Sequence, residues 1–549
     1  NVAIGKSAML ANTTSNYSIA IGSEAMGTLD GAGNSTAIGY LSMYAHNGDN
    51  NVAVGNYSLR TGSNAYNVAV GVSAMTKVSG GAGGVAIGYQ SGYHPTGNYN
   101  TWVGYTAGFG TAAGGAYNNV GVGREALLSV SSGYENTVVG YRAMKDSTTG
   151  HLNVAIGAFA ATGNTTGQEN VAIGHSALQE NQEGDDIVAV GRYALYNLNP
   201  AAGAGDTVAV GSNAGFTTTT GVQNVFVGRR AAYLNTTGSN AVIIGREAGY
   251  NNTTGGENTY IGMRTGYTNT QGEENTFVGM QAGYSVASAG ALQGSFNTFI
   301  GFKAAYSYAG GVDYGSNVAI GHQTLMTGTN ANRTVAIGNS AGVSGTASVD
   351  NVLVGYGAGS YADSTGNTMI GNKAGFRTSG NNNTVVGFRA LSGSSSGDTS
   401  HLNTVMGYAA MEGDTTSAQE NVALGAFAFT EATTGDYNTA VGYSAMRFST
   451  AAKRNTAVGY AALYQHSETT DTYNVAVGMY AGMNLYTGSH NVALGYTALR
   501  ANSSTDNRYM VAVGYGALYS VAGTDYNVGI GYLAGEKTTT GDKNIYIGA

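Results

Sequence analysis

A pentapeptide of the form Asn-Val-Ala-(Ile/Val)-Gly returns about every 17 residues from one end of this chain to the other. Its glycines begin at Gly5 and Gly22 and continue to Gly548; of the 31 spacings between them, 18 are 17 residues long and 5 are 16. The other spacings reach 22 residues, and the extra residues always follow the anchor. A short repeat of constant register indicates stacked units, none of which buries a core alone.

Repeat positions are numbered from the anchor asparagine, so that Asn1 is position 1 and Gly5 is position 5. Position 1 is Asn in 24 of 32 copies, position 2 is always Val, Ile or Thr, position 4 is always Ile, Val, Leu or Met, and position 5 is always Gly. Position 8 is Ala in 26 of the 31 complete copies and otherwise Ser or Thr. The β-branched run before glycine predicts a strand, and the many Gly, Thr and Asn residues disfavour helix.

We therefore expect an all-β chain in which residues 1–549 form one continuous parallel β-solenoid, or β-roll, of 32 coils. Each coil would hold a strand at positions 1 to 4, a glycine turn, a second short strand near positions 8 to 10, and a polar loop. The longest spacings, such as Gly191 to Gly211, would be lateral loops, and the segment from Ser285 to Ser295 would be one of them. These loops are our candidates for ligand contact.

Stacking places each residue about 4.8 Å from its equivalent in the next coil. The anchor asparagines can then form an amide ladder along the stack, while the anchor glycines permit a turn that a Cβ atom would forbid. Representative members of this predicted structural ladder are Asn1, Asn51, Asn67, Asn153, Asn170, Gly5, Gly22, Gly157 and Gly174.

Position 3 is apolar or Gly in every copy, although it points away from positions 2 and 4. A strand that is apolar on both sides is buried on both sides. We expect positions 2 and 4 inside the coil and position 3 against another copy of the chain; the alternative is a wider coil whose own loop covers that face. The bulkiest run at position 3 gives the candidate inter-chain residues Phe226, Ile243, Tyr260, Phe277 and Phe299.

Composition argues against several functions. The net charge is −8, only 10% of residues are charged, and no basic stripe exists to bind nucleic acid. No apolar run is long enough to insert into a membrane, and there is no cysteine. We find no catalytic, cofactor-binding or metal-binding pattern; the acidic stretch from Glu180 to Asp186 is interpreted as a solvated loop in preference to a calcium site. The 39 Tyr residues could stack against glycans or cover the coil edge.

The anchor resembles the head repeat of trimeric autotransporter adhesins, as in the segments 153–160 and 170–177, which read NVAIGAFA and NVAIGHSA. The longer repeat, with its Thr-Thr-Gly loop, is also similar to repeat regions of phage tail-fibre proteins. The resemblance implies a left-handed parallel β-roll, three chains side by side, and a role in attachment. The adhesin coil is shorter than this one, and this segment shows neither a membrane-anchor barrel nor a coiled-coil stalk.

These observations predict a non-catalytic segment of an extracellular fibre, at a cell or virion surface, that associates with itself as a homotrimer. Its lateral loops would contact a host-cell glycan or a surface receptor. The alternative is a self-assembling filament or sheath subunit that stacks end to end, since neither end of the repeat array carries a polar cap. Ice binding is disfavoured because the threonines at position 2, such as Thr36 and Thr101, are expected to be buried.

Overall fold

The structure is a computed structural model. It describes residues 1–549 except 12, 29–30, 32, 79, 95–96, 112–113, 287–293, 309–314, 328–330, 345–348, 362, 394–398, 414–416, 467–470 and 502–506. The chain comprises two compact units, Asn1–Gln271 and Gly272–Ala549, and each is described by itself.

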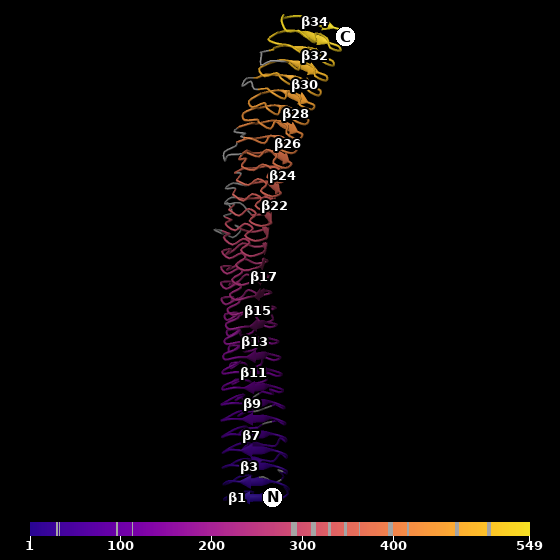
Figure 1. The fold of residues 1–549 in the computed structure, drawn as a ribbon. Helices are drawn as coiled ribbons and strands as arrows, with labels where there is room; N and C mark the ends of the chain where they lie inside the picture. The colour runs from indigo at the N-terminus through magenta and orange to yellow at the C-terminus, as the bar shows by residue number, and fades with distance from the viewer. Residues whose placement is uncertain are drawn as a thin grey trace. The chain divides into compact units, whose positions relative to one another are not determined.

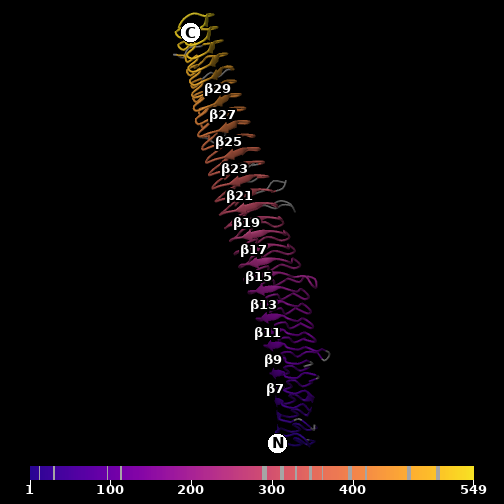
Figure 2. The same cartoon turned by 90° about the vertical axis from the view of Figure 1, so that its right-hand side faces the viewer.

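Within each unit, the anchor of every coil forms a three-residue strand, and successive strands are stacked one above another (Figures 1 and 2). In the first unit these strands are β1 (Val2–Ile4), β2 (Ile19–Ile21), β3 (Thr36–Ile38), β5 (Val52–Val54), β7 (Val68–Val70), β8 (Val85–Ile87), β9 (Thr101–Val103), β10 (Val120–Val122), β11 (Thr137–Val139), β12 (Val154–Ile156), β13 (Val171–Ile173), β14 (Val188–Val190), β15 (Val208–Val210), β16 (Val225–Val227), β17 (Val242–Ile244) and β18 (Thr259–Ile261). In the second unit they are β19 (Thr276–Val278), β20 (Thr298–Ile300), β21 (Val318–Ile320), β22 (Val335–Ile337), β23 (Val352–Val354), β24 (Thr368–Ile370), β25 (Thr384–Val386), β26 (Thr404–Met406), β27 (Val422–Leu424), β28 (Thr439–Val441), β29 (Thr456–Val458), β30 (Val475–Val477), β31 (Val492–Leu494), β32 (Val511–Val513), β33 (Val528–Ile530) and β34 (Ile545–Ile547).

All of these strands pair in parallel, and the pairing keeps anchor against anchor whatever the length of the loop between them. Val154 of β12 pairs with Val171 of β13 across an ordinary repeat. Val188 pairs with Val208, and Thr276 with Thr298, across the longer spacings that follow Gly191 and Gly279. The prediction of an all-β parallel β-solenoid with a repeat of about 17 residues is confirmed, and the described residues contain no helix.

The predicted second strand at positions 8 to 10 is wrong: the described residues there form turns or irregular backbone, and none lies in a strand. Outside the anchors, the described strands are only β4 (Ala45–His46) and β6 (Thr61–Gly62), which pair with each other. The cause is an alternation of left-handed backbone at positions 7 and 9, as at Ser176 (φ 54°) and Leu178 (φ 53°). This curl still joins the coils, because the Leu178 amide donates to the Ala194 carbonyl of the next coil at 2.9 Å.

The predicted assignment of the two strand faces is also wrong. Position 3 lies inside the coil, and the supposed inter-chain residues Phe226, Ile243, Tyr260, Phe277 and Phe299 are fully buried within their own chain, each with 0% exposure. Positions 2 and 4 point outward: Val225 and Val227 are half-buried in the single chain. The physical reason is space, since a coil this narrow holds the small Ala typical of position 3 more readily than two β-branched side chains.

Bulky residues at position 3 fit because the same coil then has a small residue at position 9. Where position 3 is Ala, position 9 is commonly Leu or Met, as in Ala189 and Leu195. Where position 3 is large, position 9 becomes Gly or Ala; a Cβ atom at Gly283 would come within 2.6 Å of the Phe277 ring. Gly359 faces Leu353 in the same way, at 2.6 Å. The two positions therefore share one packing volume inside the coil.

The anchor asparagines form a buried ladder that joins successive coils. The side-chain oxygen of Asn153 accepts a hydrogen bond from the Asn170 backbone amide at 2.9 Å, and its Nδ2 donates to the Gly167 carbonyl at 2.9 Å. Asn51 accepts likewise from the Asn67 amide at 2.8 Å. Direct amide-to-amide bonds also occur, as from Asn153 to Asn136 at 3.1 Å. Each buried side chain thus satisfies the backbone of the next coil.

Candidate functional site

We call the surface formed by positions 2 and 4 of the anchor strands in each unit the outward sheet face. These side chains are Val, Ile, Thr, Leu or Met in every coil, and none is charged. In the single chain they remain accessible: Ile156 is 40% exposed and Ile173 is 36% exposed. Exposed apolar side chains that follow one another over many coils are uncommon on monomeric proteins and are typical of interaction surfaces.

Two rows of side chains border this face. The start row is position 0, the residue directly before the anchor asparagine, and the end row is position 6, the residue directly after the anchor glycine. Toward the end of the second unit both rows are aromatic and widen the apolar face, as at Tyr509 and Tyr515 or at Tyr526 and Tyr532, all of which are exposed. Position 0 has a left-handed backbone, with φ 58° at Tyr509 and 62° at Tyr526.

Tyrosines at position 10 stack on one another away from the outward sheet face. In the first unit, Phe216, Tyr233, Tyr250 and Tyr267 form a continuous column with ring centroids 5.1 to 5.4 Å apart. Arg230 and Arg264 lie over the Tyr233 and Tyr267 rings. Because the ring faces contact each other, only ring edges face solvent within the column. The position-10 column therefore covers the coil edge and offers no flat ring face to a glycan. The tyrosines directly after the anchor glycine, such as Tyr89 and Tyr105, are a separate set and are exposed.

The lateral loops are partly described. Between β14 and β15, the loop residues Ala201, Ala202 and Gly203 are exposed, while Gly205 returns to bridge Asp185 of the preceding coil. The extra residues therefore leave the stack and rejoin it, as expected for a lateral loop. Most of the predicted loop from Ser285 to Ser295 lies outside the described residues.

Lateral hollows are present, but they are open. One of about 640 Å³ is lined by Thr106, Glu125, Leu128 and Lys145, among others. Another of about 380 Å³ is lined by Tyr356, Lys373 and Phe376, among others. They offer contact surface for a partner without the enclosure typical of a small-molecule site.

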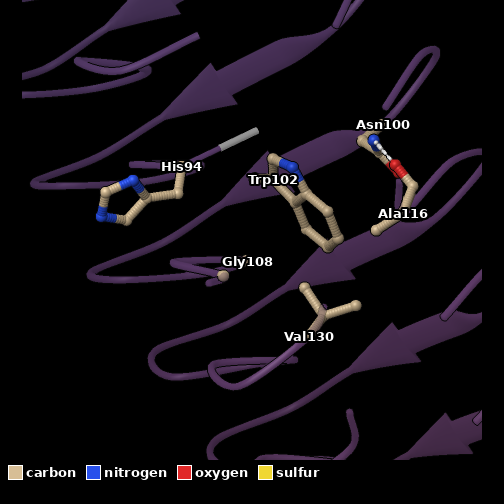
Figure 3. Close-up of a pocket in the computed structure, with 7 residues that line it drawn as sticks. His94, Asn100, Trp102, Gly108, Ala116 and Val130 are labelled. Carbon is tan, nitrogen blue, oxygen red and sulfur yellow. Dashed lines mark hydrogen bonds between the residues drawn. The ribbon is translucent and has the colours of Figure 1, made fainter. Parts of the chain in front are cut away.

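A small cavity lies inside the first unit beside Trp102, the only tryptophan in the chain. Figure 3 shows the indole ring between His94 on one side and the hydrogen-bonded pair of Asn100 and Ala116 on the other. The cavity measures about 10 Å³, which is the volume that one water molecule needs. It is a packing defect around the largest core residue and cannot hold a substrate.

Two histidines lie inside the coils at position 12, and their Nε2 atoms have no hydrogen-bond partner. The Gly48 amide donates to His46 Nδ1 at 3.3 Å, and burial lowers the pKa of His46 to about 4. Burial also lowers the pKa of His466, whose Nδ1 is bonded to the Leu485 carbonyl. Both rings are therefore neutral at pH 7, and neither belongs to a metal-binding group among the residues that the structure describes.

Within the acidic stretch from Glu180 to Asp186, Asp185 takes part in loop stacking. The Asp185 carboxylate accepts the Gln168 backbone amide of the preceding coil at 2.8 Å. Across the described residues, no three His, Cys, Asp or Glu side chains are grouped so that they could hold a metal ion. The described part of the chain also has no helix of the length and hydropathy needed to cross a membrane.

The threonines at position 2 lie on the outward sheet face and are not buried as expected; Thr36 and Thr101 are half-exposed. Burial is therefore no argument against ice binding, but in the first unit valine and isoleucine interrupt these threonines along the stack.

Neither the models of protein families nor the curated protein sequences match this chain.

Proposed function

We propose that this chain is a non-catalytic segment of an extracellular fibre, adhesin-like or tail-fibre-like, in which copies pack side by side through their outward sheet faces. The proposed assembly is a homotrimer at a cell or virion surface. Its lateral loops contact a glycan or protein receptor. The resemblance of the anchor to adhesin heads and tail fibres is consistent with this function.

The observation that supports this proposal is the exposed apolar surface of the outward sheet face. Each coil already closes its own core with positions 1, 3, 8, 9 and 12, so the apolar residues at positions 2 and 4 are not needed inside the chain. Burying the exposed two fifths of the Ile156 side chain would contribute on the order of 1 kcal/mol, and the contribution repeats in every coil. A second copy presents the same apolar face, and rotation about one axis turns the faces of all copies toward each other in a closed assembly.

The test is the double variant Ile156→Asp/Ile173→Asp, which places charge at position 4 in two successive coils. We expect the wild-type chain to be trimeric by native mass spectrometry and analytical ultracentrifugation, and the variant to dissociate. The matched control is Thr149→Asp/Thr166→Asp, because these loop residues are exposed and lie away from the anchor strands. The control should keep the wild-type mass.

A monomeric wild-type chain at micromolar concentration would contradict the proposal. So would a position-4 variant that associates as tightly as the control. Open-ended polymers without a fixed stoichiometry would favour the alternative of a filament or sheath subunit.

A further inference from the structure

The start row and the end row of the first unit carry opposite charge. The start row holds five acidic residues and no basic residue over the whole unit: Glu135, Glu169, Asp186, Asp206 and Glu257. The end row holds five basic residues and no acidic residue: Lys6, Arg124, Arg192, Arg229 and Arg246. In a chain with only 10% charged residues, such a separation across one sheet face is a specific pattern.

These charges are available for a partner. All ten side chains are exposed in the single chain. Within the described residues, Arg124 alone among them forms an ion pair, with its neighbour Glu125. Glu247, which lies beside Arg246, is already bound by Arg264 with 2.7 Å between Nε and the carboxylate. The two rows therefore have little compensation inside their own chain.

Symmetry decides which rows meet. A rotation about an axis parallel to the stack, twofold or threefold, brings the end row of one copy to the start row of its neighbour at the same height. An antiparallel twofold arrangement brings each row against itself. Opposite charges face each other only in the parallel case, whereas like charges face each other in the antiparallel case.

We infer that the basic end row of one copy pairs with the acidic start row of a second, parallel and in-register copy; this inference rests on the proposed side-by-side assembly. The heights match. Asp186 and Arg192 flank the same strand, β14, and so meet across the interface in register. Arg229 follows β16, one coil from Asp206, which precedes β15. Arg246 follows β17, one coil from Glu257, which precedes β18. One coil corresponds to a height difference of about 4.8 Å.

The experiment reverses the rows separately and together. The end-row variant is Arg192→Glu/Arg229→Glu/Arg246→Glu, the start-row variant is Asp186→Lys/Asp206→Lys/Glu257→Lys, and the third chain combines both sets. At about 50 mM salt we expect each single-row variant to raise the dissociation constant at least about tenfold, and the combined variant to return within about threefold of wild type. Circular dichroism checks that each exposed set leaves the fold intact.

If the combined variant recovers the wild-type dissociation constant, the basic row of one copy must face the acidic row of a parallel copy. Dissociation constants that do not respond to any reversal, in a chain that still dissociates on Ile156→Asp/Ile173→Asp, would overturn this inference while leaving the side-by-side assembly standing. A combined variant weaker than either single-row variant would overturn it as well. A wild-type chain that does not associate at all would instead refute the proposed function.

Discussion

At position 5 two physical constraints act on the same atom. Gly157 has φ +136°, a backbone conformation that side chains rarely adopt, and a Cβ atom there would lie 2.5 Å from the carbonyl oxygen of Gly174 in the next coil. Strain and collision with backbone cannot both be relieved by a rotamer change. This is why the anchor glycine is present in every copy.

We expect Gly157→Ala to lower the free energy of unfolding by about 3 kcal/mol or more, measured by urea denaturation. The matched control is Gly115→Ala, because a Cβ atom at Gly115 would meet nothing within 4 Å. Equal stability of the two variants would show that the close approach between anchor glycines is not a constraint.

His46 should make stability depend on pH. Its pKa is lowered to about 4 in the folded chain, below the ordinary value of 6.5, so the unfolded chain binds more protons between these values. Stability is fully present above about pH 6.5, falls as pH drops toward 4, and loses up to about 3 kcal/mol through this group. The variant His46→Asn introduces the residue that Asn164 provides at position 12 of another coil. Urea denaturation at about pH 7.5 and 4.5 should show that its free energy of unfolding falls less between these two pH values than that of the wild-type chain. The same loss in both chains would exclude His46 as the cause.

At the scale of the coil, packing volume is shared between the strand and the turn that follows it. Leu353 at position 3 fills the space that Leu325 fills from position 9 in another coil, and both are buried. Gly359 is small because Leu353 is large.

Moving the leucine should therefore be tolerated better than removing it. Leu353→Ala should cost about 2 to 4 kcal/mol through a cavity, and Gly359→Leu should cost a similar amount through overpacking. The double variant Leu353→Ala/Gly359→Leu should recover most of the loss in a double-mutant cycle. Additive losses would contradict the shared volume.

The length of a lateral loop should have little effect on the stability of the stack. Deleting Ala201, Ala202 and Gly203 restores the common repeat length between Gly191 and Gly211 and removes only exposed residues. We expect the free energy of unfolding to change by less than about 1 kcal/mol, because closing a slightly shorter loop alters the entropy only weakly. Loss of the β-sheet signal in circular dichroism would show that this loop supports the stack. Binding assays on the same variant test whether the loop contacts a receptor.

At the scale of the whole molecule, each coil is held by its two neighbours. Stability of such stacks is a sum of local terms. Hydrogen exchange on Gly157→Ala should therefore show lost protection in β11 to β13 and unchanged protection in β2 and β3 of the same unit. Uniform loss across the first unit would indicate that the unit unfolds as a single cooperative block.

Much of the fold could be predicted from the residues alone. The period, the strand at each anchor, the parallel register and the requirement for Gly at position 5 all follow from local chemistry, because β-branched residues, glycine and turn residues recur at constant spacing. The turn at positions 6 to 10 could not be predicted, since Leu178 and Met26 adopt a left-handed backbone that their side chains disfavour. The inter-coil hydrogen bonds that compensate for it exist only after stacking.

Which face of the strand lies inside was decided by the tertiary structure. Position 2 is Val, Ile or Thr, and positions 3 and 4 carry no charged or amide side chain, so polarity does not separate the faces clearly. Only the width of the closed coil excludes two β-branched side chains in favour of one small one. A signal was present in the sequence, because in every complete copy an aromatic, Ile, Leu or Met residue at position 3, such as Trp102 or Phe277, is followed by Gly or Ala at position 9. Because the side chain at position 9 is small wherever the side chain at position 3 is large, both side chains must pack into the same enclosed space, which is the interior of the coil.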